Sequence, residues 1–334
     1  MFNQKIISPD ELLGYGAVSN LNEQAIALVK QQQETWELAQ KNYRALAGVQ
    51  TKTFDFAHFK IIVQHNPERI RSSAAKTDAK SIAERPCFLC LENLPPEQKG
   101  ILFGEDYLLL TNPFPIFSTH LTIPRLQHIP QKIPAYFDDM LKLSRELNDF
   151  TVFYNGPQTG ASAPDHFHFQ AGSNGLLPFE KELAALAKNH AEVVLQNNDV
   201  TVFAVSDYLR RFIAIESENC AAIQHVFKMI YKLLPAENNQ EPLLNILCNY
   251  KNGSWQVNLF PREKQRPSHF YRTGENQFIV SPASVELGGV MIFPRPEDFN
   301  KITQKTIEEI YGEVTIREEA FLQILRQIKS FLNF

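Results

Sequence analysis

Residues 163–170 read APDHFHFQ, so that His166, His168 and Gln170 alternate with Phe167 and Phe169. Successive side chains of a β-strand point to opposite faces of the sheet. The two histidines and the glutamine would therefore share one face, and the two phenylalanines would share the other. The pattern predicts a strand over 165–172 with an apolar face in the core and a polar face available for chemistry.

The segments before this strand predict an antiparallel strand–strand–helix–strand order. Runs of β-branched and aromatic residues indicate strands, and the apolar periodicity of YFDDMLKLSREL indicates a helix. The order recurs more loosely after residue 200, where Trp255, Asn258 and Phe260 stand in place of the histidine strand. We therefore expect an α+β fold that is duplicated, with a degenerate second half. Elements expected in the first half are strands 107–111, 119–124 and 151–156 and a helix near 135–150, and one long amphipathic helix is expected over 21–46.

Composition excludes several classes of function. The chain has 334 residues, 44% of them hydrophobic, and a net charge of −4, which gives no general attraction to nucleic acid or anionic membranes. The first residues lack the pattern of a signal peptide, and no window is long and apolar enough to span a membrane. Four cysteines in this length do not form a disulfide framework. We expect a cytoplasmic protein whose paired cysteines bind metal or have a redox role.

Cys87 and Cys90 form a CFLC motif with the spacing of a zinc knuckle. Two thiolates need two further ligands to complete a closed tetrahedral site, and histidine nitrogens are the expected donors. The candidates are His128 and His166. The alternatives are that both cysteines are ordinary buried residues, or that they act as a redox pair.

His168 is the candidate nucleophile, because neutral imidazole can attack a phosphoryl group without prior deprotonation. Its second ring nitrogen needs an acceptor, such as the His166 carbonyl. Gln170 could donate its amide to a phosphate oxygen. The alternative is that His168 is a core histidine whose nitrogens are both satisfied.

Two other stretches suit phosphate binding. The loop NGPQTGAS offers backbone and side-chain donors, and the segment NPERIRSSAAK mixes arginine, lysine and serine. A solvated surface charge run is the alternative for the second stretch. The residues expected to bind substrate are Asn155, Gly160, Ser162, Arg69, Arg71, Ser73 and Lys76.

Together, NPFPIFSTHLTIPRLQH and NGPQTGASAPDHFHFQ resemble the histidine-triad-like (HIT-like) superfamily. Within it they resemble the branch of galactose-1-phosphate uridylyltransferase, diadenosine tetraphosphate phosphorylase and GDP-L-galactose phosphorylase, which carries His-x-His-x-Gln. The resemblance implies that His168 forms a covalent nucleotidyl intermediate and that Gln170 holds the transferred phosphate. It also implies that structural zinc binds the four candidate ligands, Cys87, Cys90, His128 and His166.

The resemblance implies three regions: an N-terminal helical and strand segment packing on the core (1–80), a HIT-like catalytic half (81–195), and a degenerate HIT-like half with a C-terminal helix (196–334). The uridylyltransferases usually have Ser-Asn-Pro-His-Pro-His, whereas this chain has Ala163-Pro164-Asp165 before His166. The histidine motif is therefore closer to that of the phosphorylases. A homodimer is an open possibility, because related transferases often pair their subunits.

Glutamine in place of a third histidine bears on the reaction. A carboxamide cannot act as a general acid or base, which favours a phosphate leaving group and a phosphate acceptor. We expect a nucleotidyltransferase or phosphorylase acting on a nucleoside diphosphate sugar or a dinucleoside polyphosphate. The alternatives are a HIT-type nucleotide hydrolase and a zinc-stabilised nucleotide-binding protein without turnover.

Overall fold

The computed structural model describes residues 2–70, 78–237 and 240–332. It has a ten-stranded antiparallel sheet in the order β3-β4-β5-β7-β6-β11-β12-β10-β9-β8 and a three-stranded sheet in the order β1-β2-β13. In the small sheet, β1 and β2 are antiparallel, and β13 joins β2 in parallel. The strands are β1 (Gln50–Asp55), β2 (Lys60–His65), β3 (Gly100–Phe103), β4 (Tyr107–Thr111), β5 (His120–Pro124), β6 (Phe150–Asn155), β7 (His168–Ser173), β8 (Glu192–Gln196), β9 (Thr201–Val205), β10 (Phe212–Ser217), β11 (Leu244–Lys251), β12 (Ser254–Pro261) and β13 (Val290–Phe293).

The large sheet consists of two halves with mirrored strand order. The first half runs β3-β4-β5-β7-β6 and the second runs β8-β9-β10-β12-β11, and the two halves meet where β6 pairs with β11. Residue Phe153 of β6 pairs both with Gln170 of β7 and with Leu247 of β11, and Leu247 in turn pairs with Asn258 of β12. Asn258 therefore occupies the position in the second half that Gln170 occupies in the first. The expected α+β fold, duplicated with a degenerate second half, is confirmed.

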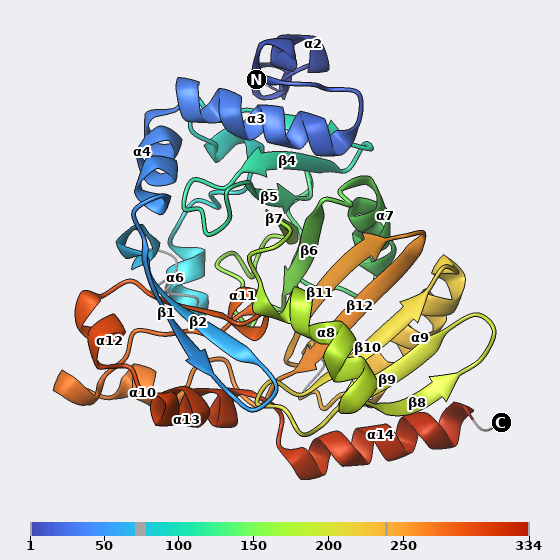
Figure 1. Ribbon diagram of the computed structural model, residues 1–334. Coiled ribbons are helices and arrows are strands. Elements are labelled where there is room, and N and C mark those ends of the chain that lie inside the picture. Colours follow the sequence, from blue (N-terminus) through green and yellow to red (C-terminus); the bar gives the residue numbers. More distant parts are fainter. Residues whose placement is uncertain (1, 71–77, 238–239, 333–334) are drawn as a thin grey trace.

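Helices cover both faces of the large sheet (Figure 1). One face packs against α3, α4, α7, α9 and α14, and the other packs against α8, α11, α12, α13 and the small sheet. Two core layers follow, one on each side of the strands. The helices are α1 (Phe2–Lys5), α2 (Pro9–Leu12), α3 (Leu21–Thr35), α4 (Glu37–Leu46), α6 (Ala79–Ala83), α7 (Phe137–Glu146), α8 (Pro178–Asn189), α9 (Cys220–Leu233), α10 (Ser268–Tyr271), α11 (Ser284–Leu287), α12 (Pro296–Lys301), α13 (Gln304–Val314) and α14 (Glu318–Leu332), with short 3-10 turns at Leu13–Tyr15, Pro67–Arg69, Leu91–Asn93 and Gly274–Asn276.

Two expected elements differ from the structure. The helix expected over 21–46 is interrupted at Trp36, which has an extended backbone and ends α3 before α4 begins. The strand expected over 165–172 begins at His168, because His166 turns back to donate its backbone N–H to the Ala163 carbonyl. The alternation of faces still holds, since Phe167 and Phe169 are fully buried in the core layer beneath α7.

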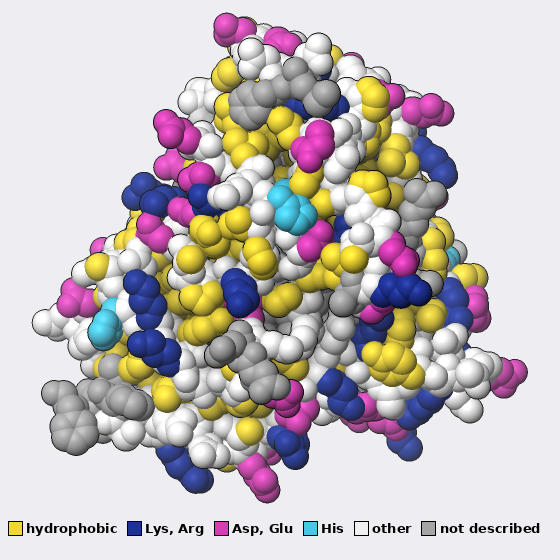
Figure 2. Space-filling model, turned by 180° about the vertical axis from the view of Figure 1, so that it is seen from behind, with side chains coloured by type: hydrophobic (Ala, Val, Ile, Leu, Met, Phe, Trp, Pro, Cys, Tyr) yellow, Lys and Arg dark blue, Asp and Glu magenta, His cyan; other side chains and the backbone are white. Residues whose placement is uncertain are grey.

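The surface shows no single-sign charge patch on the face drawn in Figure 2, where acidic and basic side chains are interspersed around apolar ones. Among the described residues, no helix combines the length and apolarity needed to cross a membrane. The cytoplasmic location and the possible homodimer remain predictions.

Candidate active site

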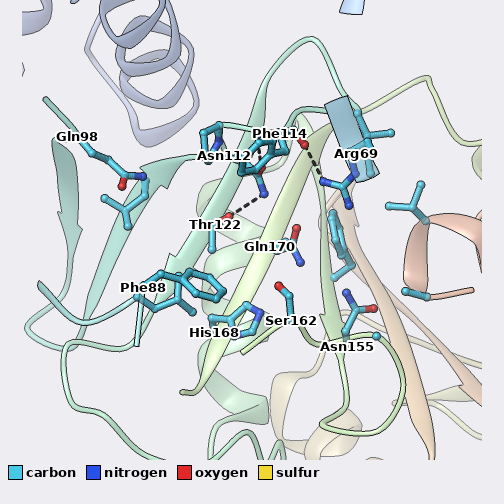
Figure 3. Close-up of a pocket in the computed structure, with 18 of the residues that line it drawn as sticks. Arg69, Phe88, Gln98, Asn112, Phe114, Thr122, Asn155, Ser162, His168 and Gln170 are labelled. Carbon is cyan, nitrogen blue, oxygen red and sulfur yellow. Dashed lines mark hydrogen bonds between the residues drawn. The ribbon is translucent and has the colours of Figure 1, made fainter. Parts of the chain in front are cut away.

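A cavity of about 640 Å³ lies on the face of the first half-sheet opposite α7. His168 and Gln170 form its floor, side by side on β7 (Figure 3). Loops that follow or precede the strands form its walls. The residues used below that line it are Arg69, Phe88, Gln98, Asn112, Phe114, Thr122, Asn155, Gly160, Ser162, Ala283 and Glu286.

His168 is held in one tautomer and aimed at the cavity. Its Nδ1 lies 2.8 Å from the His166 carbonyl, which can only accept, so Nδ1 carries the proton and Nε2 keeps its lone pair. The side chain of Gln131 fixes the backbone of His168 by accepting from its N–H and donating to its carbonyl. Burial lowers the pKa of His168 to about 4. A neutral imidazole with a free nitrogen at the cavity floor can act as a nucleophile.

The orientation of the Gln170 carboxamide is set by His120 of the neighbouring strand. The Ile116 backbone N–H donates to Nδ1 of His120, so the proton is on Nε2, which donates to Oε1 of Gln170 over 3.0 Å. Burial lowers the pKa of His120 to about 3, so the ring is neutral. With Oε1 engaged, the amide N–H groups of Gln170 remain to serve a phosphate oxygen.

The loop after β6 places further donors at the cavity. Oδ1 of Asn155 accepts from Nδ2 of Asn245 and from the Ser284 backbone, which leaves the Asn155 amide as the donor at the cavity wall (Figure 3). Gly160 has a φ of +110°, and a Cβ there would come within 2.4 Å of the Ala283 Cβ. Glycine is therefore required for the loop to approach α11. Asn155, Gly160 and Ser162 all line the cavity, and their binding of substrate stays a prediction.

Four of the expected substrate-binding residues come from the segment NPERIRSSAAK, and the structure describes one of them. Arg69 lines the cavity across from Phe88, and its Nη1 donates to the Phe114 carbonyl over 2.7 Å (Figure 3). Arg71, Ser73 and Lys76 lie outside the described residues. The buried carboxyl of Glu286 also lines the cavity, and burial raises its pKa to about 7. The cavity thus carries a cation and a titratable acid.

The four candidate metal ligands lie together, with their ligand atoms within 4.8 Å of one another. Sγ of Cys87 is 3.3 Å from Nδ1 of His166, and Sγ of Cys90 is 3.1 Å from Nδ1 of His128. Tetrahedral zinc with its usual bond lengths separates such atoms by about 3.3 to 3.8 Å. Nε2 of His166 donates to the Arg125 carbonyl over 2.7 Å, which leaves Nδ1 for a metal. The donor set and its outer hydrogen bond fit a zinc ion.

Two family descriptions match the chain: "Domain of unknown function (DUF4922)" over residues 28–173, and "GDPGP1-like, C-terminal domain" over residues 184–334. Among solved structures, yeast Ap4A phosphorylase Apa2 has a TM-score of 0.54 at 14% identity, with 84% of this chain and 94% of that chain covered. The same yeast protein in complex with Ap4A has a TM-score of 0.52 at 16% identity, with 86% and 97% covered. No curated protein matches the sequence.

The fold of this chain is thus similar to that of the yeast Ap4A phosphorylase. In this fold His168 and Gln170 line the cavity, whereas His166 is not among its lining residues and lies with the candidate metal ligands.

Sequence reasoning missed four residues of this candidate site: His120, Gln131, Glu286 and Gln98. The side chains of His120 and Gln131 reach β7 because strand pairing and loop closure bring their segments beside it. Glu286 comes from a distant part of the chain. His120 sits in the quoted stretch STHLTIP, and its alternation with Thr122 on β5 was the one available signal.

Proposed function

We propose that this protein is a nucleotidyltransferase of the phosphorylase type, acting on a nucleoside diphosphate sugar or a dinucleoside polyphosphate. The observation that carries the proposal is the hydrogen bond from Nδ1 of His168 to the His166 carbonyl, which leaves Nε2 facing the cavity. The HIT-like fold, and the likeness of that fold to a yeast Ap4A phosphorylase, support this choice.

In the first step, the Nε2 lone pair of His168 attacks the α-phosphorus of the substrate. The bond from phosphorus to the leaving phosphate oxygen breaks, and the leaving group takes the electron pair. Positive charge on the ring is shared with the His166 carbonyl through the Nδ1–H bond. The amides of Gln170 and Asn155, whose side-chain oxygens already accept hydrogen bonds, would donate to the equatorial oxygens, where charge increases.

In the second step, an oxygen of phosphate or of a sugar phosphate attacks the same phosphorus. The P–N bond breaks and returns the electron pair to Nε2, so His168 is neutral again. Neither step requires a proton on the leaving group, because a phosphate leaves readily as an anion. Gln170, which cannot titrate, is therefore sufficient where a third histidine would supply protons.

The first test of this reaction compares turnover with and without inorganic phosphate. Nucleotide sugars and dinucleoside polyphosphates are incubated with the protein, and products are separated by ion-exchange chromatography. We expect nucleoside diphosphate to form from substrate and phosphate, and little turnover without phosphate. Nucleoside monophosphate appearing at the same rate in both buffers would instead establish the hydrolase alternative.

We further propose that Cys87, Cys90, His128 and His166 hold a structural zinc ion. When bound, zinc would cross-link three parts of the chain: the CFLC loop, the loop after β5 that carries His128, and the segment before β7 that carries His166. All four coordination positions are protein ligands, so none remains for a substrate.

Replacing one ligand tests the zinc site. Cys90→Ser is expected to lose the metal and to lower the midpoint of thermal unfolding by several degrees or more, because structural zinc contributes directly to folding. Metal content by mass spectrometry and thermal unfolding are the measurements. The matched control is Cys220→Ser, a thiol on α9 outside the cluster, which should change neither. Wild-type protein purified without chelator and lacking stoichiometric metal would refute the proposal.

A further inference from the structure

The cavity has two sides of different chemistry. Figure 3 shows Gln98 and Phe88 to one side of His168, and Arg69 and Asn155 to the other. The side of Gln98 also carries Leu94, Pro95 and Leu110, of which Leu94 and Leu110 pack together as buried apolar residues. We call Phe88, Leu94, Pro95, Gln98 and Leu110 the apolar arm. Arg85 also lines the cavity beside this arm, with its guanidinium carbon 4.9 Å from the centre of the Phe88 ring. The apolar side chains suit a flat aromatic group, and Arg69 on the other side suits phosphate.

Gln98 places one unsatisfied acceptor in the apolar arm. The residue is only 6% exposed, and its Nε2 donates to the Thr111 carbonyl over 3.2 Å. That bond assigns the amide nitrogen to the Thr111 side and Oε1 to the opposite side. Within the described residues Oε1 has no hydrogen-bond partner, and it is not among the fully buried unpaired atoms, so it opens to the cavity that Gln98 lines.

The carboxamide of Asn112, which also lines the cavity, already has hydrogen-bond partners for both its nitrogen and its oxygen. Nδ2 of Asn112 donates to the Thr122 hydroxyl over 2.9 Å, and its Oδ1 accepts from the Phe114 backbone. Asn112 therefore offers no unpaired oxygen. A ligand group entering the apolar arm would meet apolar surface and the single acceptor of Gln98. An N–H donor on that group would satisfy it, and a group without one would leave it unpaired.

The strand order of the sheet indicates how far His168 lies from the Oε1 atom of Gln98. Leu110 of β4 pairs with Thr122 of β5, which pairs with Gln170 of β7. Gln98 itself lies on no strand, but its side chain bonds to Thr111 of β4. Two strand spacings, about 10 Å, separate β4 from β7, which carries His168. An extended purine nucleotide spans such a distance from its α-phosphorus to the far edge of its base, and a single-ring base falls short.

We infer that Gln98 selects the base of the nucleotide, its Oε1 accepting a hydrogen bond from the amino group of adenine or guanine held in the apolar arm. The inference rests on the proposed function in taking His168 as the site of the α-phosphate. It adds to that function a substrate class, the aminopurine nucleotides.

Equilibrium binding tests this inference separately from turnover. Calorimetry with wild-type protein would compare ADP with purine riboside diphosphate, GDP with IDP, and all four with CDP and UDP. Each amino-free analogue lacks the donor that Oε1 requires, and one lost hydrogen bond corresponds to about tenfold in affinity. We expect ADP or GDP to bind about tenfold more tightly than its amino-free analogue and than the pyrimidine nucleotides.

Gln98→Met keeps the length of the side chain and removes the acceptor. In this variant the ratio between the amino nucleotide and its analogue should fall to within about twofold of one. Gln323→Met, the same substitution at an exposed position of α14, should keep the wild-type ratio. Circular dichroism checks that both variants are folded. Should Gln98→Met misfold, the wild-type comparison of analogues still decides.

Equal binding of amino and amino-free nucleotides by the wild type, or an unchanged ratio in folded Gln98→Met, would overturn the inference. So would tighter binding of CDP or UDP. If base selection is found but no phosphate-dependent turnover, the proposed function fails while base recognition stands. If phosphate-dependent turnover is found but all nucleotides bind equally, base recognition by Gln98 fails while the proposed function stands.

Discussion

His168 and Gln170 stand two residues apart on β7 and have different chemical capacities. In the proposed reaction His168 supplies a nucleophilic nitrogen, and Gln170 supplies donors that cannot lose or gain a proton. Each is held by a neighbour: the His166 carbonyl fixes the tautomer of His168, and the His120 ring fixes the carboxamide of Gln170. The site is therefore organised before any substrate arrives, as electrostatic stabilisation of a transition state requires.

The buried ring of His120 predicts a pH dependence of stability. Its folded pKa is about 3, below the value near 6.5 expected for the unfolded chain, so the unfolded state takes up the proton first as the pH falls. The contribution of His120 to stability is therefore complete above pH 6.5 and decreases below it. Relative to His120→Gln, the wild type should lose about 1.4 kcal/mol of unfolding free energy per pH unit below pH 6.

Urea unfolding of both proteins at pH 7, 6 and 5 measures this difference. Groups common to both proteins, the metal ligands included, cancel in the comparison. Parallel loss of stability in wild type and His120→Gln would show that His120 titrates normally and that its ring is not held as described.

The site residues that the sequence predicts lie in short motifs, whereas those that it does not predict come from distant segments of the chain. Cys87, Cys90, His166 and His168 lie in short motifs whose spacing carries the chemistry, so the sequence predicts their roles. Gln98 and Glu286 enter the cavity only because distant segments fold beside β4 and β7. No local spacing encodes that proximity, and a single sequence therefore cannot reveal it.

At the level of elements, the ends of strands and the loops that follow them build the site. β7 begins only at His168, which frees His166 to turn toward the cysteines. The alternation rule predicted the faces correctly but placed the start of the strand too early, because the turn at Ala163 is a contact that periodicity does not show. The break at Trp36 likewise escapes the pattern, since residues on both sides of it favour a helix.

The Gly160 loop predicts a graded effect of substitution. In Gly160→Ala the new residue must adopt a positive φ, and its Cβ lies 2.4 Å from the Ala283 Cβ. In Gly175→Ala the new residue must also adopt a positive φ, of +99°, but its Cβ has no atom within 4 Å. A positive φ at a non-glycine residue lowers the unfolding free energy by about 1 to 2 kcal/mol, and a steric clash lowers it by about 1 to 3 kcal/mol more. Gly160→Ala should therefore lower the unfolding free energy more than Gly175→Ala.

Urea unfolding of the two variants gives the comparison, and equal losses would mean that the loop does not pack against α11 as described. Because Gly160 and Ala283 both line the cavity, Gly160→Ala should also weaken nucleotide binding. Gly175→Ala lies away from this cavity and should leave nucleotide binding unchanged.

The large sheet contains the same strand order twice, once in each half. Only the first half carries the His-x-His-x-Gln motif, whose His168 and Gln170 line the cavity. By strand register Asn258 takes the position of Gln170 and Gln256 takes the position of His168, and Gln256 bonds to the side chain of Glu216. The second half therefore lacks the nucleophile at the equivalent position. It contributes to the first site instead through Asn245, which orients Asn155, and through the segment that includes Ala283 and Glu286.

Sequence patterns predicted the duplicated α+β fold and four strands and one helix of the first half, because periodicity and strand propensity are local. They did not predict how the second half closes the first cavity, since that depends on the pairing of β6 with β11 and on long-range loops. The boundaries at residues 80 and 195 remain predictions. They concern where the chain passes between regions, which the strand order alone does not fix.

The central claim is that His168 forms a covalent bond to the α-phosphorus, and protein labelling tests it most directly. The protein is incubated with a nucleotide substrate labelled at the α-phosphate, without an acceptor, then denatured and analysed for acid-labile, base-stable label on a His168 peptide. We predict near-stoichiometric label on wild type and none on His168→Ala, with His190→Ala, which replaces a histidine outside the cavity, labelled like wild type. Label that persists on His168→Ala, or the absence of label with a substrate that the protein turns over, would contradict the account.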